Sequence, residues 1–301
     1  MTKFIVATAI FYAMLAFNVF HVGESIVPTP KDYLNATSQA PTTISNTGEQ
    51  YIQDAIQEIQ HPIHGAATSS NMDKAKFDAV CKSNTTLCNE VNFESTFSDK
   101  DKYVYLAGIF RIANFINNYI TTQQKIEDTL QKVAVSNDNG QRRWYATHDT
   151  VIFNLWYVAS KAEFLELVSH EFGHITDLGM IQGTDNNKDT TYTEFGSPVF
   201  ALDDISLKFY ALSRANETIR RSTAVKKDFC SGYGMSDPFE DFAECFNLYL
   251  NHNSLFQTFA LNDAIMKKKF NFIAALFTGK YINKWTSTLS VNDRPRDTTK
   301  I

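Results

Sequence analysis

A predicted helix that carries two histidines one turn apart constrains this chain more than any other segment. Its start is marked by Ser160-Lys-Ala-Glu163, the pattern of a capping box, in which the serine hydroxyl caps the first turn and the glutamate reaches back. The helix is expected to stop at Gly179, since glycine commonly follows the last helical residue. Within it, His170-Glu-Phe-Gly-His174 has the i, i+4 spacing that places both imidazoles on one face, within reach of a single ion.

Zinc is the ion that such a pair favours, because neutral imidazole nitrogen is among its preferred ligands. Glu171 follows the first histidine and can point at a zinc-bound water, whose proton it would take as general base and then pass to a leaving amine. The alternative is a pair of surface histidines on an amphipathic helix, which the glycine inside the helix, Gly173, mildly favours. Gly173 also lets another element approach closely, as an active-site helix requires. We therefore predict one catalytic Zn²⁺ at this helix.

A third protein ligand is expected on a second helix, whose start is indicated by Asp237 as N-cap and Pro238 as first helical residue. Glu240 and Glu244 share one face of this helix and are flanked by aromatic residues. Buried carboxylates are costly unless they bind a metal or pair with a donor. We expect Glu240 to be a zinc ligand and Glu244 to accept a hydrogen bond from a ligand histidine. A solvated acidic patch at the helix N-terminus would explain Glu240 but not Glu244.

These two helices together resemble a known group of metallopeptidases. A His-Glu-x-x-His helix, then Glu240-Asp-Phe-Ala-Glu244 with Tyr233 seven residues before its first glutamate, resembles the catalytic domain of the anthrax lethal factor family. The pattern is also similar to that of secreted Pro-Pro endopeptidases of the same gluzincin group. The later segments 251–256 and 267–277 are similar to the tails of bacterial zinc metallopeptidases, so the resemblance covers about residues 149–280.

The resemblance implies a role for each motif residue. His170, His174 and Glu240 would be the zinc ligands. Glu171 would be the general base, and Tyr233 would supply the hydroxyl that stabilises the tetrahedral oxyanion. The long gap between His174 and Glu240 leaves room for an inserted loop, and we expect the cleft loops at 183–197 and 221–232.

The residues between the two helices bear on two other zincin groups, the aspzincins and the metzincins. The segment 183–192 is similar to the aspzincin signature, in which an aspartate, here Asp189, is the third ligand, although it has two extra residues and lacks the final glycine. The metzincin pattern fails, because it requires glycine where Asp177 stands and histidine where Met180 stands. Asp177 is instead expected to support a ligand or to cap the turn.

The fold class follows from the remaining patterns. Two β-branched and aromatic runs, 144–147 and 151–158, are strand candidates. Residues 64–100 are predicted to be polar and rich in loops, and 103–115 is too continuously apolar to assign by period. Further helical patterns span residues 52–59, 116–120, 125–130, 202–212 and 254–277. We predict an α+β, zincin-like fold, mostly helical, with a small and mainly antiparallel sheet beside the active-site helix.

The N-terminus is typical of a secretory signal peptide, with Lys3, an apolar run over residues 4–17 and small residues at Gly23 and Ser25. An uncleaved membrane anchor is the competing interpretation, because the run is long. We divide the chain into a signal peptide (1–25), a flexible leader or propeptide-like segment (26–50) and a single domain (51–301). The protein is expected to be secreted, without stable membrane association after cleavage.

Net charge limits the classes of binding partner, and the cysteines indicate possible disulfides. The 28 Lys and Arg residues against 33 Asp and Glu residues leave a net charge of −5 without a basic stripe, which disfavours nucleic acid. Export permits disulfides, and Cys81–Cys88 with Cys230–Cys245 is one of three possible pairings.

The sequence therefore predicts a secreted zinc metalloendopeptidase that acts on a protein or peptide substrate. A secreted binding protein that has lost catalysis but keeps the zincin fold is the alternative from another class. An aspzincin-type protease with Asp189 as third ligand, and an exopeptidase, for which no amine-binding motif is found, are the other two.

Overall fold

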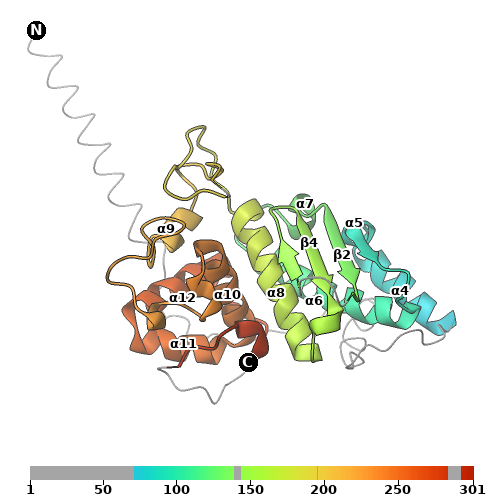
Figure 1. Ribbon diagram of the computed structural model, residues 1–301. Coiled ribbons are helices and arrows are strands. Elements are labelled where there is room, and N and C mark those ends of the chain that lie inside the picture. The colour runs from blue at the N-terminus through green and yellow to red at the C-terminus, as the bar shows by residue number, and fades with distance from the viewer. Residues whose placement is uncertain (1–70, 139–143, 195, 284–292) are drawn as a thin grey trace, which may run out of the picture.

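The computed structural model describes residues 71–138, 144–194, 196–283 and 293–301. The predicted signal peptide, the leader and the helical pattern at 52–59 lie outside these residues. Figure 1 shows a sheet with its helices beside a group of helices from the second half of the chain. None of the helices in the described ranges combines the length and apolar character needed to cross a bilayer.

The sheet has four short strands, β1 (Val91–Phe93), β2 (Lys132–Ser136), β3 (Trp144–Ala146) and β4 (Thr150–Asn154). Their spatial order is β1-β2-β4-β3. β1 pairs with β2 and β2 with β4 in parallel, whereas β3 pairs with β4 in antiparallel orientation. β3 is therefore an edge strand.

The prediction of a mainly antiparallel sheet is wrong, because two of the three strand pairs are parallel. The β2–β4 pair is parallel because the chain runs along the edge as β3 and returns as β4 between β3 and β2. The β1–β2 pair is parallel because of a long crossover. Helix α6 (Asp99–Tyr119) carries the chain back between β1 and β2, and a parallel neighbour is the result. Only the short turn between β3 and β4 produces an antiparallel pair. The coarser prediction, a mixed chain with many helices and one small sheet, is confirmed.

One hydrophobic core joins the sheet to α6 and to helix α8 (Lys161–Ile175). Phe164 of α8 packs edge-on against Tyr105 of α6 and Phe153 of β4, with ring centroids 4.8 and 6.0 Å apart. A Cβ at Gly108 of α6 would lie 2.7 Å from the Phe164 ring, so glycine permits this close approach. The core thereby fixes α8 beside the sheet.

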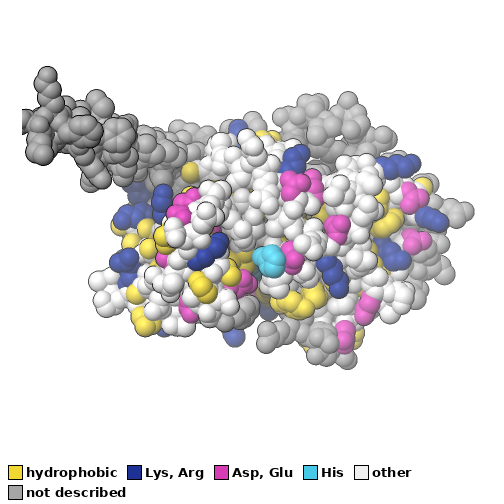
Figure 2. All heavy atoms as spheres, turned by 90° about the horizontal axis from the view of Figure 1, so that it is seen from above, with side chains coloured by type: hydrophobic (Ala, Val, Ile, Leu, Met, Phe, Trp, Pro, Cys, Tyr) yellow, Lys and Arg dark blue, Asp and Glu magenta, His cyan; other side chains and the backbone are white. Residues whose placement is uncertain are grey.

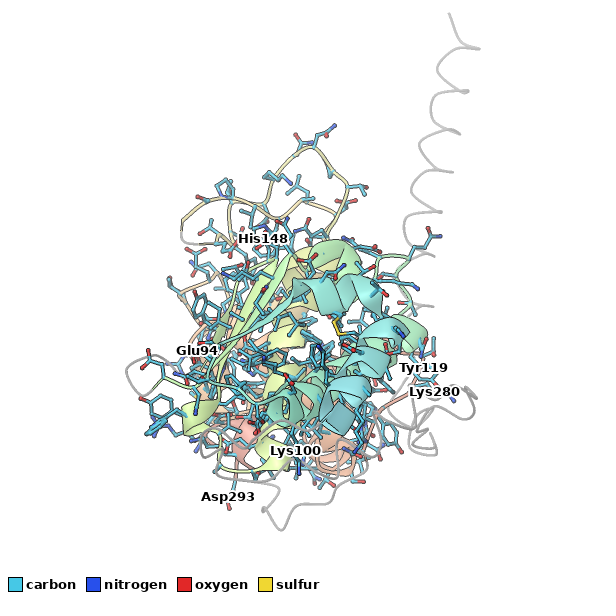
Figure 3. The ribbon with its side chains drawn as sticks, turned by 90° about the vertical axis from the view of Figure 1, so that its right-hand side faces the viewer. Glu94, Lys100, Tyr119, His148, Lys280 and Asp293 are labelled. Carbon is cyan, nitrogen blue, oxygen red and sulfur yellow. A yellow bond between two sulfur atoms is a disulfide. The ribbon has the colours of Figure 1, made fainter. Side chains whose placement is uncertain are left out.

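The region 64–100, which was predicted to be loop-rich, contains two helices over its described part. These are α4 (Asn71–Ser83) and α5 (Thr85–Glu90), and α5 is capped by the side chain of Asn84. Of the three cysteine pairings that the sequence leaves open, the structure has the one that includes Cys81–Cys88. This disulfide links the two helices, as the yellow bond in Figure 3 illustrates. Helix α7 (Ile126–Thr129) falls where a helical pattern was expected.

The second half of the chain is mostly helical and follows the predicted order. After α8, the described residues contain the α-helices α9 (Ser206–Tyr210), α10 (Pro238–Asn251), α11 (Asn253–Asn262) and α12 (Ala264–Leu276). Short 3₁₀ turns occur at η1 (Leu155–Tyr157), η3 (Lys226–Asp228), η4 (Tyr233–Met235) and η5 (Thr298–Lys300). Acidic and basic side chains are interspersed over the face in Figure 2.

Helices α8 and α10 meet at Gly173. A Cβ at this position would lie 3.0 Å from the backbone Cα of Ala243 and 3.2 Å from Cβ of Phe246. Neither atom belongs to a flexible side-chain end that could move aside. The glycine therefore sets the distance between the two helices that carry the predicted ligands.

The Gly173→Ala variant is expected to lose stability, although alanine is favoured over glycine in a helix by about 1 kcal/mol. The added methyl group would push α10 away from α8, and overpacking of this kind costs about 1–3 kcal/mol. Urea unfolding of the metal-free protein measures the change. An unchanged or higher free energy of unfolding would contradict the close contact.

Candidate metal centre

Local sequence positions α8 as predicted. The Ser160 hydroxyl accepts a hydrogen bond from the backbone N–H of Glu163 at 3.1 Å, and the Glu163 carboxylate reaches back to the N–H of Ala159 at 2.6 Å. The α-helix ends at Ile175, and a π-helical turn (Thr176–Met180) replaces the expected last α-turn. The His-Glu-x-x-His segment therefore lies in the last turns of the α-helix.

Asp237 and Pro238 position α10 in the same way. The Asp237 carboxylate accepts from the N–H of Glu240 at 2.8 Å, and Pro238 is the first helical residue. The second disulfide of this pairing joins Cys230 and Cys245, and it links α10 to the segment that leads to Tyr233. Because both sulfur atoms are bonded, the nearby group of Cys230, Asp241 and Cys245 is not a ligand set.

The structure brings His170, His174 and Glu240 together. Nε2 of His170 lies 3.1 Å, and Nε2 of His174 lies 3.5 Å, from Oε2 of Glu240. One potential ligand atom from each of the three residues lies within 4.8 Å of the others. Two imidazole nitrogens and one carboxylate oxygen are a donor set that suits a catalytic zinc ion with an open position.

Burial and charge couple the three side chains of this cluster. His170 is fully buried, and the Glu240 side chain is 18% exposed. Burial alone would lower the pKa of His170, but the carboxylates of Glu240 and Glu244 raise it well above its ordinary value. Burial would raise the pKa of Glu240, but the two imidazoles hold it far below its usual range. The two imidazoles and the Glu240 carboxylate are therefore electrostatically coupled.

Glu244 lies on the other side of the His170 ring. Its Oε1 is 3.0 Å from Nδ1 of His170, and its Oε2 accepts from the backbone N–H of Thr298 at 2.8 Å. Glu244 is completely buried. A carboxylate at Nδ1 directs the opposite nitrogen, Nε2, towards a metal and increases its basicity.

Tyr233 and Glu171 lie at the same centre. The Tyr233 hydroxyl donates to Oε1 of Glu240 at 2.8 Å, and its ring stacks on the His170 ring with centroids 6.2 Å apart. Burial, followed by the charge of Glu240, raises the pKa of Tyr233, so the hydroxyl keeps its proton. Only 1% of the Glu171 surface is exposed to solvent. Glu171 and His174 nevertheless line a cleft beside the cluster.

The cleft beside the cluster has a volume of about 1160 Å³. One wall is the edge strand β3 with the following residue, Thr147, and Trp144 and Phe239 add apolar surface. The segment around Glu194 contributes as expected, but the second contribution comes from Glu217 and Thr218 rather than from 221–232. The sequence predicts a strand at β3, but nothing in the sequence indicates that this strand lines the site.

Asp189 and Asp177, the two aspartates considered from the sequence, lie in separate hydrogen-bonded turns. Asp189 accepts from the N–H groups of Thr191 and Tyr192 at 2.8 Å each, and it is not in the His170 cluster. Asp177 accepts from the Tyr210 hydroxyl at 2.6 Å, so it ties the π-helical turn to α9. Burial raises the pKa of Asp177 to about 7.

Comparison with known proteins gives no family assignment. No known family, curated protein or solved structure matches the chain. Function is therefore inferred from the residues and the geometry of the site.

Proposed function

We propose that the protein is a secreted zinc metalloendopeptidase with a zincin-like fold. The observation that carries this proposal is the cluster of His170, His174 and Glu240, whose potential ligand atoms lie within 4.8 Å of one another at the edge of a cleft. The helix bearing both histidines lies beside the sheet, and the edge strand β3 lines the same cleft. These features together favour hydrolysis of an extended chain over simple metal storage.

His170, His174 and Glu240 would hold the ion. Zinc in such a site supplies a Lewis acid for the scissile carbonyl and lowers the pKa of a bound water to about 7. Glu244 supports this arrangement, because its contact with Nδ1 of His170 orients the ring.

Glu171 and Tyr233 would carry the proton transfers and the charge stabilisation. Glu171 takes the proton of the attacking water and then delivers it to the leaving amine. The Tyr233 hydroxyl, which donates its one hydrogen to Glu240 in this structure, would turn to donate it to the oxyanion that develops on the carbonyl oxygen. A single donor of this kind contributes about 3 kcal/mol to transition-state stabilisation.

The substrate would bind as an extended peptide along β3. This strand is last in the described sheet, and its one sheet partner is β4. An extended peptide can add to such an edge through main-chain hydrogen bonds, with side chains directed alternately to and from the cleft. Two disulfides support an oxidising location, as expected of a secreted protein.

An inactive binding protein of the same fold is less well supported. Loss of catalysis would be expected to remove the base or the oxyanion donor, and both Glu171 and Tyr233 are retained in the cleft. The aspzincin alternative is also disfavoured, because Asp189 is engaged in its own turn.

Zinc content separates the two ligand assignments. The Glu240→Gln variant is expected to bind zinc about 100-fold more weakly than wild type, because the only carboxylate of the cluster is lost. Asp189→Asn is the matched control and should retain full zinc content. Metal analysis after dialysis against a weak chelator measures both. If Asp189→Asn alone loses zinc, Glu240 is not the third ligand.

A further inference from the structure

Residues 293–301, here called the tail segment, lie next to the two helices that carry the proposed zinc ligands. The tail segment contacts α8 and α10 through η5, and in Figure 1 it is the dark red piece at the lower end of α8. Its first residue, Asp293, lies at the opposite end of the molecule from His148, which belongs to the turn between β3 and β4 (Figure 3). The tail segment therefore approaches the centre from the end away from this turn.

The tail segment is anchored by Arg294. The guanidinium group donates to the backbone carbonyls of Phe229 at 3.0 Å and Lys227 at 2.7 Å, and it stacks 3.7 Å above the centre of the Phe259 ring. Arg294 is only 6% exposed. Its anchor lies just before the segment that bears Tyr233.

The next two residues hold the backbone at Tyr233. The N–H of Gly232 donates to the carbonyl of Pro295, and the N–H of Tyr233 donates to the carbonyl of Arg296, both at 2.7 Å. These two bonds fix the start of η4, from which the Tyr233 side chain extends to Glu240.

Thr298 then reaches the back of the ligand histidine. Its backbone N–H donates to Oε2 of Glu244 at 2.8 Å, while Oε1 of the same carboxylate lies 3.0 Å from Nδ1 of His170. All three residues are fully buried. With one oxygen held by Thr298, the carboxylate cannot rotate away from the imidazole without leaving a buried N–H unsatisfied, which is unfavourable.

We propose that the tail segment is a positioning element of the metal centre, and that the backbone N–H of Thr298 orients Glu244 and, through it, the imidazole of His170. This proposal rests on the proposed zinc site and adds a positioning residue, Thr298, that is 128 positions from His170 in the sequence. Because the contact uses a backbone group, the side chain at position 298 does not reveal it.

Thr298→Pro is a selective probe of this N–H. Thr298 is the first residue of η5, a position that proline tolerates, and Asp297 before it has the extended conformation (φ −152°, ψ 125°) that proline requires of its neighbour. Thr298→Val is the matched control, since it keeps the N–H and removes only the hydroxyl, which proline removes as well. This hydroxyl accepts from Asn247 at 3.1 Å and donates to the backbone carbonyl of Glu244 at 3.4 Å.

The dissociation constant for Zn²⁺, measured by competition with a chelator on the full chain, is the first readout. Thr298→Pro is expected to raise it about 10–100-fold, as loss of an outer partner of a ligand histidine does, and Thr298→Val less than about threefold. In a Glu244→Ala background, Thr298→Pro should add no further loss, because the group through which it acts is gone. An equal loss with and without Glu244 would overturn the proposal.

Two further measurements keep the outcome decisive. If Thr298→Pro does not fold, Arg294→Met replaces it, because it releases the anchor without touching Glu244 or His170. This variant should weaken zinc binding at least about fivefold, again only when Glu244 is present. Wild-type affinity in Arg294→Met would overturn the proposal.

The metal-free protein separates this inference from the proposed function. If His170→Ala leaves zinc binding unchanged, the zinc site itself is wrong. The Nδ1 proton resonance of His170 in the metal-free protein then decides the role of the tail segment. A resonance that changes in Thr298→Pro but not in Thr298→Val supports positioning, and identical spectra for the two variants overturn it.

Discussion

The Glu171→Gln variant is expected to hydrolyse peptides about 10³-fold more slowly than the wild type, while its zinc content stays unchanged. Glutamine has nearly the shape of glutamate but cannot take a proton from the attacking water. Glu171 is not a member of the ligand cluster, which consists of His170, His174 and Glu240. Loss of the base should therefore lower turnover without releasing the metal. Steady-state cleavage of a peptide library and metal analysis of the same sample measure the two quantities.

Glu166→Gln is the matched control for this experiment. Glu166 is on the same helix and equally buried, but its carboxylate pairs with His252 at 3.0 Å. This variant should lose stability and keep its turnover number once folded. Wild-type turnover in Glu171→Gln would end the proposed mechanism, whereas similar losses in both variants would assign the effect to helix α8 as a whole.

Local signals explain why the two ligand helices could be predicted from the sequence. The caps at Ser160 and Asp237 act within three residues of their partners, and both are present in the structure. Glu240 and Glu244 were selected by the cost of burying carboxylates among aromatic residues. Glu244 is fully buried, as this reasoning requires.

The sheet could not be predicted in the same way, because its pairing depends on distant segments. β1 has only three residues, and its partner β2 lies beyond the whole of α6. Within α6 the continuous run from Tyr103 to Phe110 is buried on all sides, which hides the 3.6-residue period. The length of this apolar run was visible, but its identity as a crossover helix was not.

The contacts of the tail segment are the least visible from sequence. Thr298 acts through its backbone N–H, and Pro295 and Arg296 act through carbonyl groups. Every residue type except proline offers the first group, and every residue offers the second. No residue pattern can therefore identify such contacts.

A buried ion pair joins α12 to α10 on the far side of the helix from the cleft-lining Glu240. Lys269 of α12 is fully buried, and its ammonium group donates to the carboxylate of Asp241 and, at 2.6 Å, to the backbone carbonyl of Asp228. Asp241 also accepts from the Ser213 hydroxyl at 3.1 Å. Burial lowers the pKa of Lys269, and the charge of Asp241 opposes this effect. The pair connects α12 to α10 at the residue that follows Glu240, the proposed zinc ligand.

Lys269→Met is expected to lower the free energy of unfolding by about 3–5 kcal/mol, because it leaves the Asp241 carboxylate buried without its counter-charge. The double variant Lys269→Met/Asp241→Leu removes both charges and should recover most of this loss, since a buried ion pair and an apolar pair of similar volume are of comparable stability. Urea unfolding of the metal-free wild type, both single variants and the double variant gives the coupling between the two residues.

A loss below about 1 kcal/mol in Lys269→Met would mean that Asp241 finds another partner or a proton at little cost. A double variant less stable than Lys269→Met would show that the pair contributes to packing beyond its charges. The predicted order, with the single variant below the double, follows from the desolvation cost of one uncompensated charge. That cost would fall on the helix that must hold Glu240 in register with the two histidines.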